Sequence, residues 1–214
     1  MLCGMDKEFN QSQDTESRIL QAAEKEFFEK GLAGARTASI AEAAGVTHAM
    51  LHYYFRTKDK LFERIVTEKM NMLEKMVLSA IGDNNLPLED RIRQGVEHHF
   101  DFIAANHELP RFLVNEVYAH PERLEMMKVN MQDIAGEMLN NLQREIDEYA
   151  AKGLCQQADA KMLLIDIVSL NVFPFMAAPI ISEITGNTYE DYDGFLAIRK
   201  KENVETILRK LKIH

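Results

Sequence analysis

TASIAEAAGVTHAMLHYYFRTKDKL, residues 37–61, is the stretch that decides how this chain folds. Thr37 has a hydroxyl suited to capping a short helix, and Gly45 suits the left-handed turn that ends one. Thr47 can cap a second helix, on which Leu51 points back toward the first. The pattern therefore predicts a helix-turn-helix, a motif whose second helix normally enters the major groove of DNA.

The outward side of the second helix is free of acidic residues. Placing Leu51 inward at about 100° per residue leaves one face exposed. That face comprises His48, Ala49, Met50, His52 and Tyr53. Because DNA phosphates are negatively charged, an acid-free face favours DNA contact, although a solvated helix in another α-helical bundle would show the same periodicity.

Residues 15–62 resemble the N-terminal domain of TetR-family transcriptional regulators. That family combines an IL-x-AA-x-x-x-F helix ending in Gly, a T-x-x-IA-x-x-AGV-[ST] segment, and a Y-x-YF segment followed by Lys. The matching residues are Ile19, Leu20, Ala22, Ala23, Phe27, Gly31, Thr37, Ile40, Ala41, Ala44, Gly45, Val46, Thr47, Tyr54, Phe55, Lys58 and Leu61. Two positions differ: His52 replaces the first Tyr of Y-x-YF, and Met50 replaces a small hydroxyl residue.

The resemblance implies a homodimer that binds double-stranded DNA at a pseudo-palindromic operator. It assigns Thr37, Thr47, Tyr54 and Lys58 to backbone phosphates. His48, Ala49 and Tyr53 are assigned to the floor of the groove, with Met50 and His52 beside them. It also implies that a small-molecule effector controls DNA binding and that the regulator is a repressor.

Composition and charge are compatible with this interpretation. The 214 residues carry a net charge of −9, but residues 16–64 hold eight Lys/Arg against seven acids. The acidic excess therefore lies outside the motif, and local charge governs phosphate contact over about 8–10 Å at physiological salt. Two cysteines are too few for a disulfide framework. The absence of a long apolar run or an apolar N-terminal segment predicts a cytoplasmic protein with no membrane partner.

The breaks along the chain predict an all-α fold. We expect a flexible arm over residues 1–14, a DNA-binding domain over 15–60, and a ligand-binding and dimerisation domain over 61–214. A long helix without Gly or Pro runs from Lys58 to about Ile81 and joins the two. The first helix should open at Asp14 or Thr15 and close at Gly31. The expected later helices are 88–105, 109–119, 122–152, 159–173 and 190–212, with a kinked segment over 174–185.

Functional residues in the second half are assigned from the resemblance and from apolar stripes. A cavity among the middle helices binds ligand in relatives, and the last two large helices pair across a two-fold axis. The expected pocket wall is Phe100, Phe112, Tyr118, Met127, Met131 and Phe173. The expected dimer interface is Leu163, Ile167, Leu170, Leu196, Val204, Ile207 and Leu211. Most bulky apolar residues of this kind are plain core in any helical protein.

Two other classes of function stay open at this point. An interaction module without DNA binding is one, because Met50 and His52 depart from the family pattern. A metal-dependent enzyme is the other, because His98 and Asp101 lie on one helix face, and His107, Glu116 and His120 could join them. Adjacent histidines point about 100° apart on a helix, and neither a phosphate-binding Gly loop nor a G-x-S-x-G elbow is present. We therefore expect no enzyme activity, no cofactor and no metal.

Overall fold

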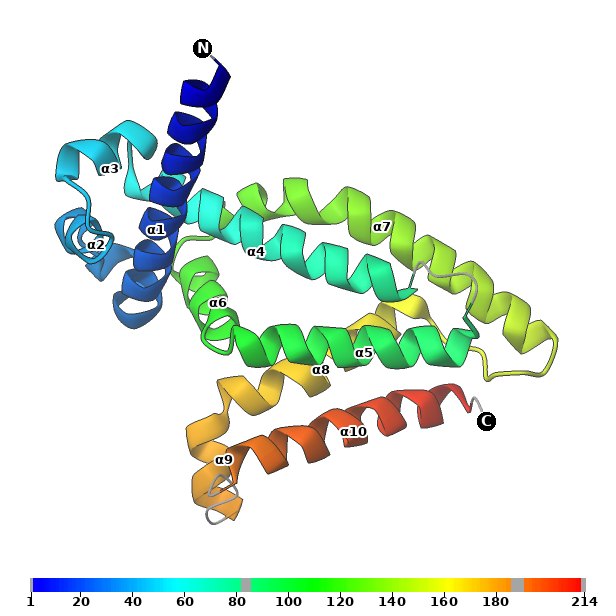
Figure 1. The fold of residues 1–214 in the computed structure, drawn as a ribbon. Helices are drawn as coiled ribbons and strands as arrows, with labels where there is room; N and C mark the ends of the chain where they lie inside the picture. Colours follow the sequence, from blue (N-terminus) through cyan, green and yellow to red (C-terminus); the bar gives the residue numbers. More distant parts are fainter. Residues whose placement is uncertain (1, 82–85, 186–190, 213–214) are drawn as a thin grey trace. The chain divides into compact units, whose positions relative to one another are not determined.

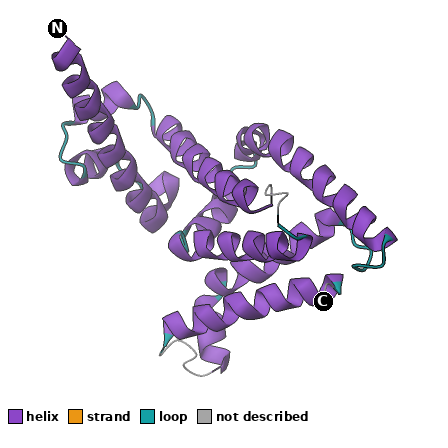
Figure 2. Ribbon diagram, turned by 45° about the vertical axis from the view of Figure 1, so that its right-hand side comes forward, coloured by secondary structure: helices purple, strands orange, loops and turns teal. Residues whose placement is uncertain are grey.

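The structure, a computed structural model, describes residues 2–81, 86–185 and 191–212, except for the side chains of 2–13, 77–78, 80–81, 126–135 and 185. These residues form α-helices joined by loops, and none of them lies in a strand (Figures 1 and 2). The expectation of an all-α fold is confirmed.

The chain divides into two compact units. The first comprises Met1–Lys69 with Phe112–Met127, and the second comprises Met70–Arg111 with Lys128–His214. Residues 61–69 and 112–127, which we had expected in the second domain, therefore group with the helix-turn-helix. Helices α4 (Lys58–Ile81), α6 (Leu109–Ala119) and α7 (Glu122–Ala151) each contribute residues to both units.

The first unit begins with α1 (Leu2–Gly34), α2 (Thr37–Ala43) and α3 (His48–Tyr54). Helix α1 starts at Leu2 and not at Asp14 or Thr15, so residues 2–13 are helical where we had expected a flexible arm. This segment contains no proline, and extending an existing helix is much easier than nucleating a new one. Gly31, with φ 67° and ψ 166°, interrupts the regular helix at the residue where we had expected its end.

Aromatic side chains from distant parts of the sequence fill the core of this unit. Phe112 of α6 lies against Phe27, Phe28 and Phe62, with ring centroids 6.5, 5.1 and 5.7 Å apart. Phe27, Phe62 and Phe112 are buried. Rings of this size supply much of the burial energy of a small unit, so Phe112 makes its part of α6 an integral part of the first unit.

The second unit packs α5 (Leu88–Ala105) and the later part of α7 against α8 (Ala160–Met176) and α10 (Tyr192–Leu211), with α9 (Ala178–Thr185) after α8. Its core is a continuous apolar cluster. The fully buried members are Leu88, Val96, Ile146, Ala160, Leu163, Ile207 and Leu211. These residues recur at helical spacing, which is why the periodicity located the helices correctly.

Helix α8 continues through Pro174, where we had expected it to stop, and ends at Met176. A proline inside a helix cannot donate a hydrogen bond to the carbonyl four residues earlier. That carbonyl belongs to Leu170, and it accepts a 3.0 Å hydrogen bond from the side-chain amide of Asn203 on α10. The helix tolerates Pro174 because a neighbouring helix supplies the missing donor.

Among the described residues, no single helix is long and apolar enough to span a membrane. The pair Ala160–Met176 and Ala178–Ile184, bent by 75°, passes that test by length and composition alone.

Candidate functional site

Helix α3 is held in place by a cap at its start and an anchor on its inner side. The hydroxyl of Thr47 accepts a 3.1 Å hydrogen bond from the backbone N–H of Met50, as the sequence predicted. Leu51 is 1% exposed, and Phe55 just after the helix is also buried. Gly45, with φ 65°, makes the left-handed turn between α2 and α3. The helix-turn-helix predicted from residues 37–55 is confirmed.

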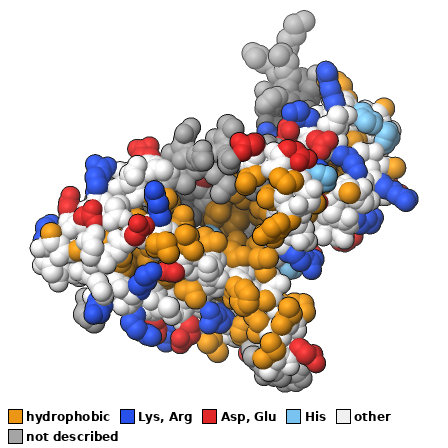
Figure 3. Space-filling view, turned by 180° about the vertical axis from the view of Figure 1, so that it is seen from behind, with side chains coloured by type: hydrophobic (Ala, Val, Ile, Leu, Met, Phe, Trp, Pro, Cys, Tyr) orange, Lys and Arg blue, Asp and Glu red, His pale blue; other side chains and the backbone are white. Residues whose placement is uncertain are grey.

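The face opposite Leu51 is open to solvent. His48, Ala49, Met50, His52 and Tyr53 are all exposed, Tyr53 at 82%. Tyr54 is half-buried and its ring lies 5.4 Å from that of Tyr53. Figure 3 shows histidine and basic side chains gathered on the part of the first unit that carries α2 and α3. The outward face expected from the helical period is confirmed, and its contact with DNA remains a prediction.

His48 and His52 form a pair along this face. Four positions apart, they lie with ring centroids 4.4 Å apart in an edge-to-face arrangement. Nε2 of His48 is 3.0 Å from the hydroxyl of Thr37, and Nδ1 of His52 is 3.3 Å from the backbone oxygen of Arg56. These contacts orient both imidazole rings in the unbound protein.

The structure bears on two residues of the expected phosphate-binding set, whose contact with DNA stays a prediction. Thr37 is the first residue of α2 and not its cap, because Arg36 holds the cap position without a side-chain hydrogen bond. Lys58 donates from Nζ to the backbone oxygens of Leu32 at 2.9 Å, Ala33 at 3.4 Å and Ala35 at 2.9 Å. Its ammonium group therefore satisfies carbonyls at the end of α1, where helix ends leave acceptors without partners.

Arg56 is a basic residue beside α3 that is better placed than Lys58 to contact a phosphate. It is exposed, and no ion pair of its guanidinium is found among the described residues. Lys60 and Arg64, by contrast, pair with Glu63 at 2.6 Å and with Glu68 at 2.8 Å. Arg56 was not in the expected phosphate-binding set, because the family pattern singles out Lys58; Arg56 immediately follows the buried Phe55.

The residues expected to wall a pocket differ in burial and belong to two different units. Phe112 belongs to the core of the first unit, Tyr118 is 85% exposed and Phe173 is 62% exposed. Phe100 is buried in the second unit, with its ring centroid 5.5 Å from that of Phe175. Met127 and Met131 lie outside the described side chains. Large apolar residues were chosen for size, and size does not distinguish core, surface and cavity positions.

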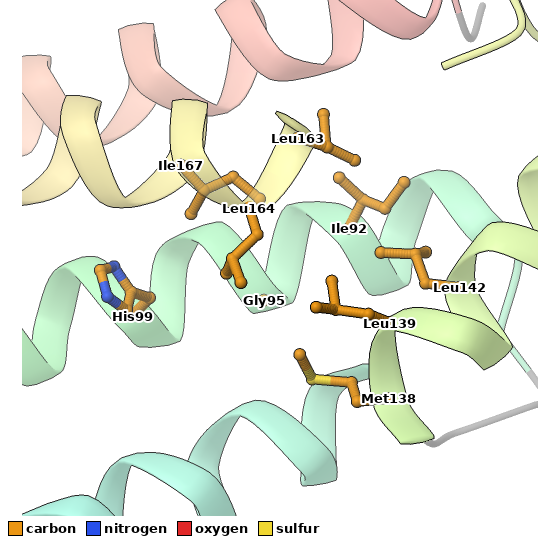
Figure 4. A pocket seen from close by; sticks show the side chains of 9 residues that line it. All are labelled: Ile92, Gly95, His99, Met138, Leu139, Leu142, Leu163, Leu164 and Ile167. Atoms are coloured by element: carbon orange, nitrogen blue, oxygen red, sulfur yellow. The ribbon is translucent and has the colours of Figure 1, made fainter. Parts of the chain in front are cut away.

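The second unit contains a cavity of about 50 Å³ between α5, α7 and α8 (Figure 4). Its walls are apolar apart from one histidine. The lining residues are Ile92, Gly95, His99, Met138, Leu139, Leu142, Leu163, Leu164 and Ile167. Of these, the sequence had singled out Leu163 and Ile167, for another role. His99 could have been found, because it falls on the same stripe of α5 as Ile92 and Val96.

The residues expected at the dimer interface are mostly interior to one chain. Leu163, Val204, Ile207 and Leu211 are at most 2% exposed, and Ile167 and Leu170 pack against the same core cluster. Leu196 is half-buried. Leu163, Val204, Ile207 and Leu211 are already buried in a single chain and have no surface to offer a partner. The interface role of Ile167, Leu170 and Leu196 stays a prediction. Helices α8 and α10 also carry exposed apolar side chains.

On α8 these exposed side chains lie on the side away from Leu163, and α9 and α10 carry others. They include Met162 at 51%, Ile165 at 54%, Phe173 at 62%, Ile180 at 64% and Ile198 at 64%. Figure 3 shows hydrophobic side chains over α8 and α9. Single exposed apolar residues are ordinary, whereas large contiguous groups of them are typical of interaction surfaces.

Most of the residues considered for metal chemistry have other partners. Asp101 pairs with Lys200 at 2.8 Å, and His98 Nδ1 is 3.3 Å from the backbone oxygen of Met76. His120 lies against Glu122, and Glu116 is occupied within the first unit. Within the described part of the chain, no group of three or more metal-ligating side chains converges. The enzyme alternative gains no support from this arrangement.

A capped, anchored second helix with an exposed, acid-free face defines the class of helix-turn-helix DNA-binding proteins. Two family profiles match this chain: "Bacterial regulatory proteins, tetR family" over residues 19–65, and "Tetracyclin repressor-like, C-terminal domain" over residues 89–207. The chain belongs to the TetR family of bacterial transcriptional regulators.

Individual relatives agree with this membership. The regulator YdgC of Bacillus subtilis is 28% identical over 135 residues, covering 62% of this chain and 66% of YdgC. The repressor NicS of Pseudomonas putida is 28% identical over 147 residues, covering 67% of each protein. The chain thus matches about two thirds of the length of these relatives. The crystal structure of PfmR from Thermus thermophilus has the same fold, with a TM-score of 0.64 at 19% identity, over 90% of this chain and 97% of PfmR.

Proposed function

We propose that this regulator binds a pseudo-palindromic DNA operator as a homodimer and is released when a small molecule binds in its second unit. The observation that carries the proposal is the outward face of α3, which presents five exposed side chains and contains no acidic residue. Such a face can approach base edges without repulsion from phosphates. Because its operator is genomic DNA, we propose that it acts in the cytoplasm.

The proposed DNA contacts follow from the exposed geometry. His48, Ala49 and Tyr53 face the groove, with Met50 and His52 beside them. Thr47, Tyr54 and Arg56 flank that face and suit backbone phosphates, while Thr37 acts by orienting His48. Arg56 takes the place we had given to Lys58. Two copies of α3 would be separated by about 34–36 Å, one turn of DNA.

The exposed apolar surface of α8–α10 supports the proposed homodimer. Met162, Ile165, Phe173 and Ile198 would leave water when two copies associate. Burying apolar area is the main drive for such assembly. A two-fold axis places each of these residues in the interface twice, so a few side chains account for much of the contact.

The apolar cavity of the second unit supports the proposed effector. At about 50 Å³ it is far smaller than the roughly 300–1,000 Å³ of sites for drug-sized ligands. An effector would therefore fill the cavity with one end and widen the space between α5, α7 and α8. We propose that this regulator acts as a repressor, which is also the role that the name of its relative NicS states for NicS.

Fluorescence anisotropy with labelled DNA from upstream of the chain's own gene tests this function. We expect binding that unlabelled copies of that DNA displace and unrelated DNA does not. Tyr53→Ala should weaken it, while Lys25→Ala, an exposed change on α1, should not. Equal binding to unrelated DNA, or none at all, would leave an α-helical interaction module as the better interpretation.

A further inference from the structure

The exposed face of α3 carries two histidines at a spacing that suits a metal ion. His48 and His52 are four positions apart in the segment HAMLH, and both are exposed. Residues four apart lie on the same side of a helix, with Cβ atoms about 5–6 Å from each other. Two histidines at this spacing also hold zinc in the H-E-x-x-H helix of metalloproteases. The sequence analysis assigned this pair to DNA contact alone.

The distance between the two rings fits a shared ion. With Zn–N bonds of about 2.0–2.1 Å and ring atoms about 1.1 Å from the ring centre, two imidazoles at about 90–110° around one ion have centroids about 4.4–5.2 Å apart. The centroids of His48 and His52 are 4.4 Å apart. Exposed side chains change rotamer within nanoseconds, so both rings can turn toward an ion while α3 stays in place.

The hydrogen bond of His52 leaves the right nitrogen for a metal. Nδ1 of His52 is 3.3 Å from the backbone oxygen of Arg56. A carbonyl oxygen can only accept, so in the neutral ring Nδ1 carries the proton and Nε2 carries the lone pair. Histidines that bind metals usually donate their other ring N–H to a carbonyl or carboxylate in this way.

His48 has a comparable arrangement with the nitrogens exchanged. Its Nε2 is 3.0 Å from the hydroxyl oxygen of Thr37, which can accept a hydrogen bond from Nε2–H and leave Nδ1 with the lone pair. In the part of the chain that the structure describes, neither Nδ1 of His48 nor Nε2 of His52 has a hydrogen-bond partner. Each ring therefore has one nitrogen free to bind a metal.

We propose that His48 and His52 chelate one divalent transition-metal ion on the outward face of α3. Imidazole suits Zn²⁺, Cu²⁺ and Ni²⁺, whereas Mg²⁺ and Ca²⁺ prefer oxygen ligands. No third ligating side chain converges among the described residues, so water completes the coordination and the ion exchanges with solvent. The proposal replaces the expectation of no metal and goes beyond the proposed function, since it requires neither operator DNA nor an effector.

The first test measures Ni²⁺ binding to the full chain by isothermal titration calorimetry in metal-free buffer. Nickel is the probe because Zn²⁺ would also bind cysteine thiolates. Chelation binds the second imidazole at a high effective concentration, so His48→Ala and His52→Ala should each weaken binding by about tenfold or more. His107→Ala, which removes an exposed histidine outside the pair, should leave the affinity unchanged.

A second variant separates chelation from the number of histidines. His52→Ala combined with Tyr53→His keeps two exposed histidines but places them five positions apart, about 140° from each other around the helix. This protein should bind Ni²⁺ as weakly as His52→Ala does. Wild-type affinity in the double variant would overturn the proposal. Unchanged affinity in both single variants, or no Ni²⁺ binding by the wild-type protein, would overturn it as well.

NMR locates the ion in the wild-type protein, independently of how well the variants fold. In long-range ¹H–¹⁵N spectra, substoichiometric paramagnetic Ni²⁺ should broaden the ring signals of two histidines together. Signals that are missing from His48→Ala and His52→Ala assign the two rings. Mg²⁺ at the same concentration should shift neither of them. Broadening of other histidine rings instead of these two would overturn the proposal.

Discussion

The backbone N–H of Leu32 donates a 3.0 Å hydrogen bond to Oε1 of Glu116, which lies 84 positions further along the chain. The other carboxylate oxygen accepts from Arg123, whose guanidinium lies 5.4 Å from the centroid of the Phe62 ring. Glu116 is only 8% exposed. One carboxylate thus joins the end of α1 to α6 and to the first turns of α7, all within the DNA-binding unit.

Replacing Glu116 by alanine should destabilise the first unit by about 2–4 kcal/mol, because a buried N–H and a guanidinium lose their acceptor together. Urea unfolding followed by circular dichroism measures this loss. Glu29→Ala, an exposed change on α1, is the matched control and should cost less than about 0.5 kcal/mol. Equal stability of the two variants would show that the Leu32 and Arg123 contacts contribute nothing.

Arg56→Ala and Lys58→Ala should affect different quantities. Loss of Arg56 should reduce the slope of log affinity against log salt by about 1–2 units for a dimer, one contact per half-site. Loss of Lys58 should lower the free energy of unfolding by roughly 1.5–3 kcal/mol, because three carbonyls lose a charged donor. Salt titrations by anisotropy and urea unfolding measure the two effects. The reverse pattern would restore Lys58 to the phosphate-binding set.

Leu163→Glu and Ile165→Glu make the same change two positions apart on α8. Ile165 is 54% exposed in the single chain and Leu163 is fully buried. We expect Ile165→Glu to remain folded and to sediment as a monomer, since a charge in the dimer interface costs several kcal/mol when unpaired. Leu163→Glu should fail to fold, because the unpaired charge would then be buried in the core of the second unit. A folded, dimeric Ile165→Glu protein would move the interface away from this face of α8.

His99 should make the protein sensitive to mild acid. Its folded pKa of about 4 lies below the unfolded value of 6.5, so between these values the unfolded chain binds more protons. The folded state therefore loses stability as pH falls from 6.5 toward 4, by on the order of 3 kcal/mol in total. Thermal unfolding across this range should show a shallower acid dependence in His99→Phe. Parallel curves for the two proteins would contradict the burial of a neutral ring.

The sequence specified the DNA-binding unit closely because its signals are local. Thr47, Gly45 and Leu51 act within a few residues of each other, so spacing alone determines the cap, the turn and the inward side of α3. The role of Lys58 was not accessible in this way, because its partners Leu32 and Ala35 lie on another helix. Phe112 shows the same limit, since its contacts with Phe27 and Phe62 depend on how distant helices pack.

The second unit shows why residue type alone misleads. Leu163 and Ile165 are similar apolar residues on one helix, and only the packing of α5 and α10 decides which of them is interior. The surroundings of His99 depend on Asn171 and Asn203. The amide orientations of these two residues depend in turn on Arg199 and on the Leu170 carbonyl, which Pro174 leaves without a backbone donor. Periodicity predicts which side of a helix is apolar, but not what covers it.

The grouping of residues 112–127 with the first unit has a consequence for how the chain is made. Synthesis proceeds from the N-terminus, so the helix-turn-helix leaves the ribosome well before α6 does. Until Phe112 and Glu116 arrive, the aromatic surface of Phe27 and Phe62 and the N–H of Leu32 lack their partners. A nascent chain that stops at residue 69 therefore carries the motif without its completed core, which closes only once more than half of the polypeptide exists.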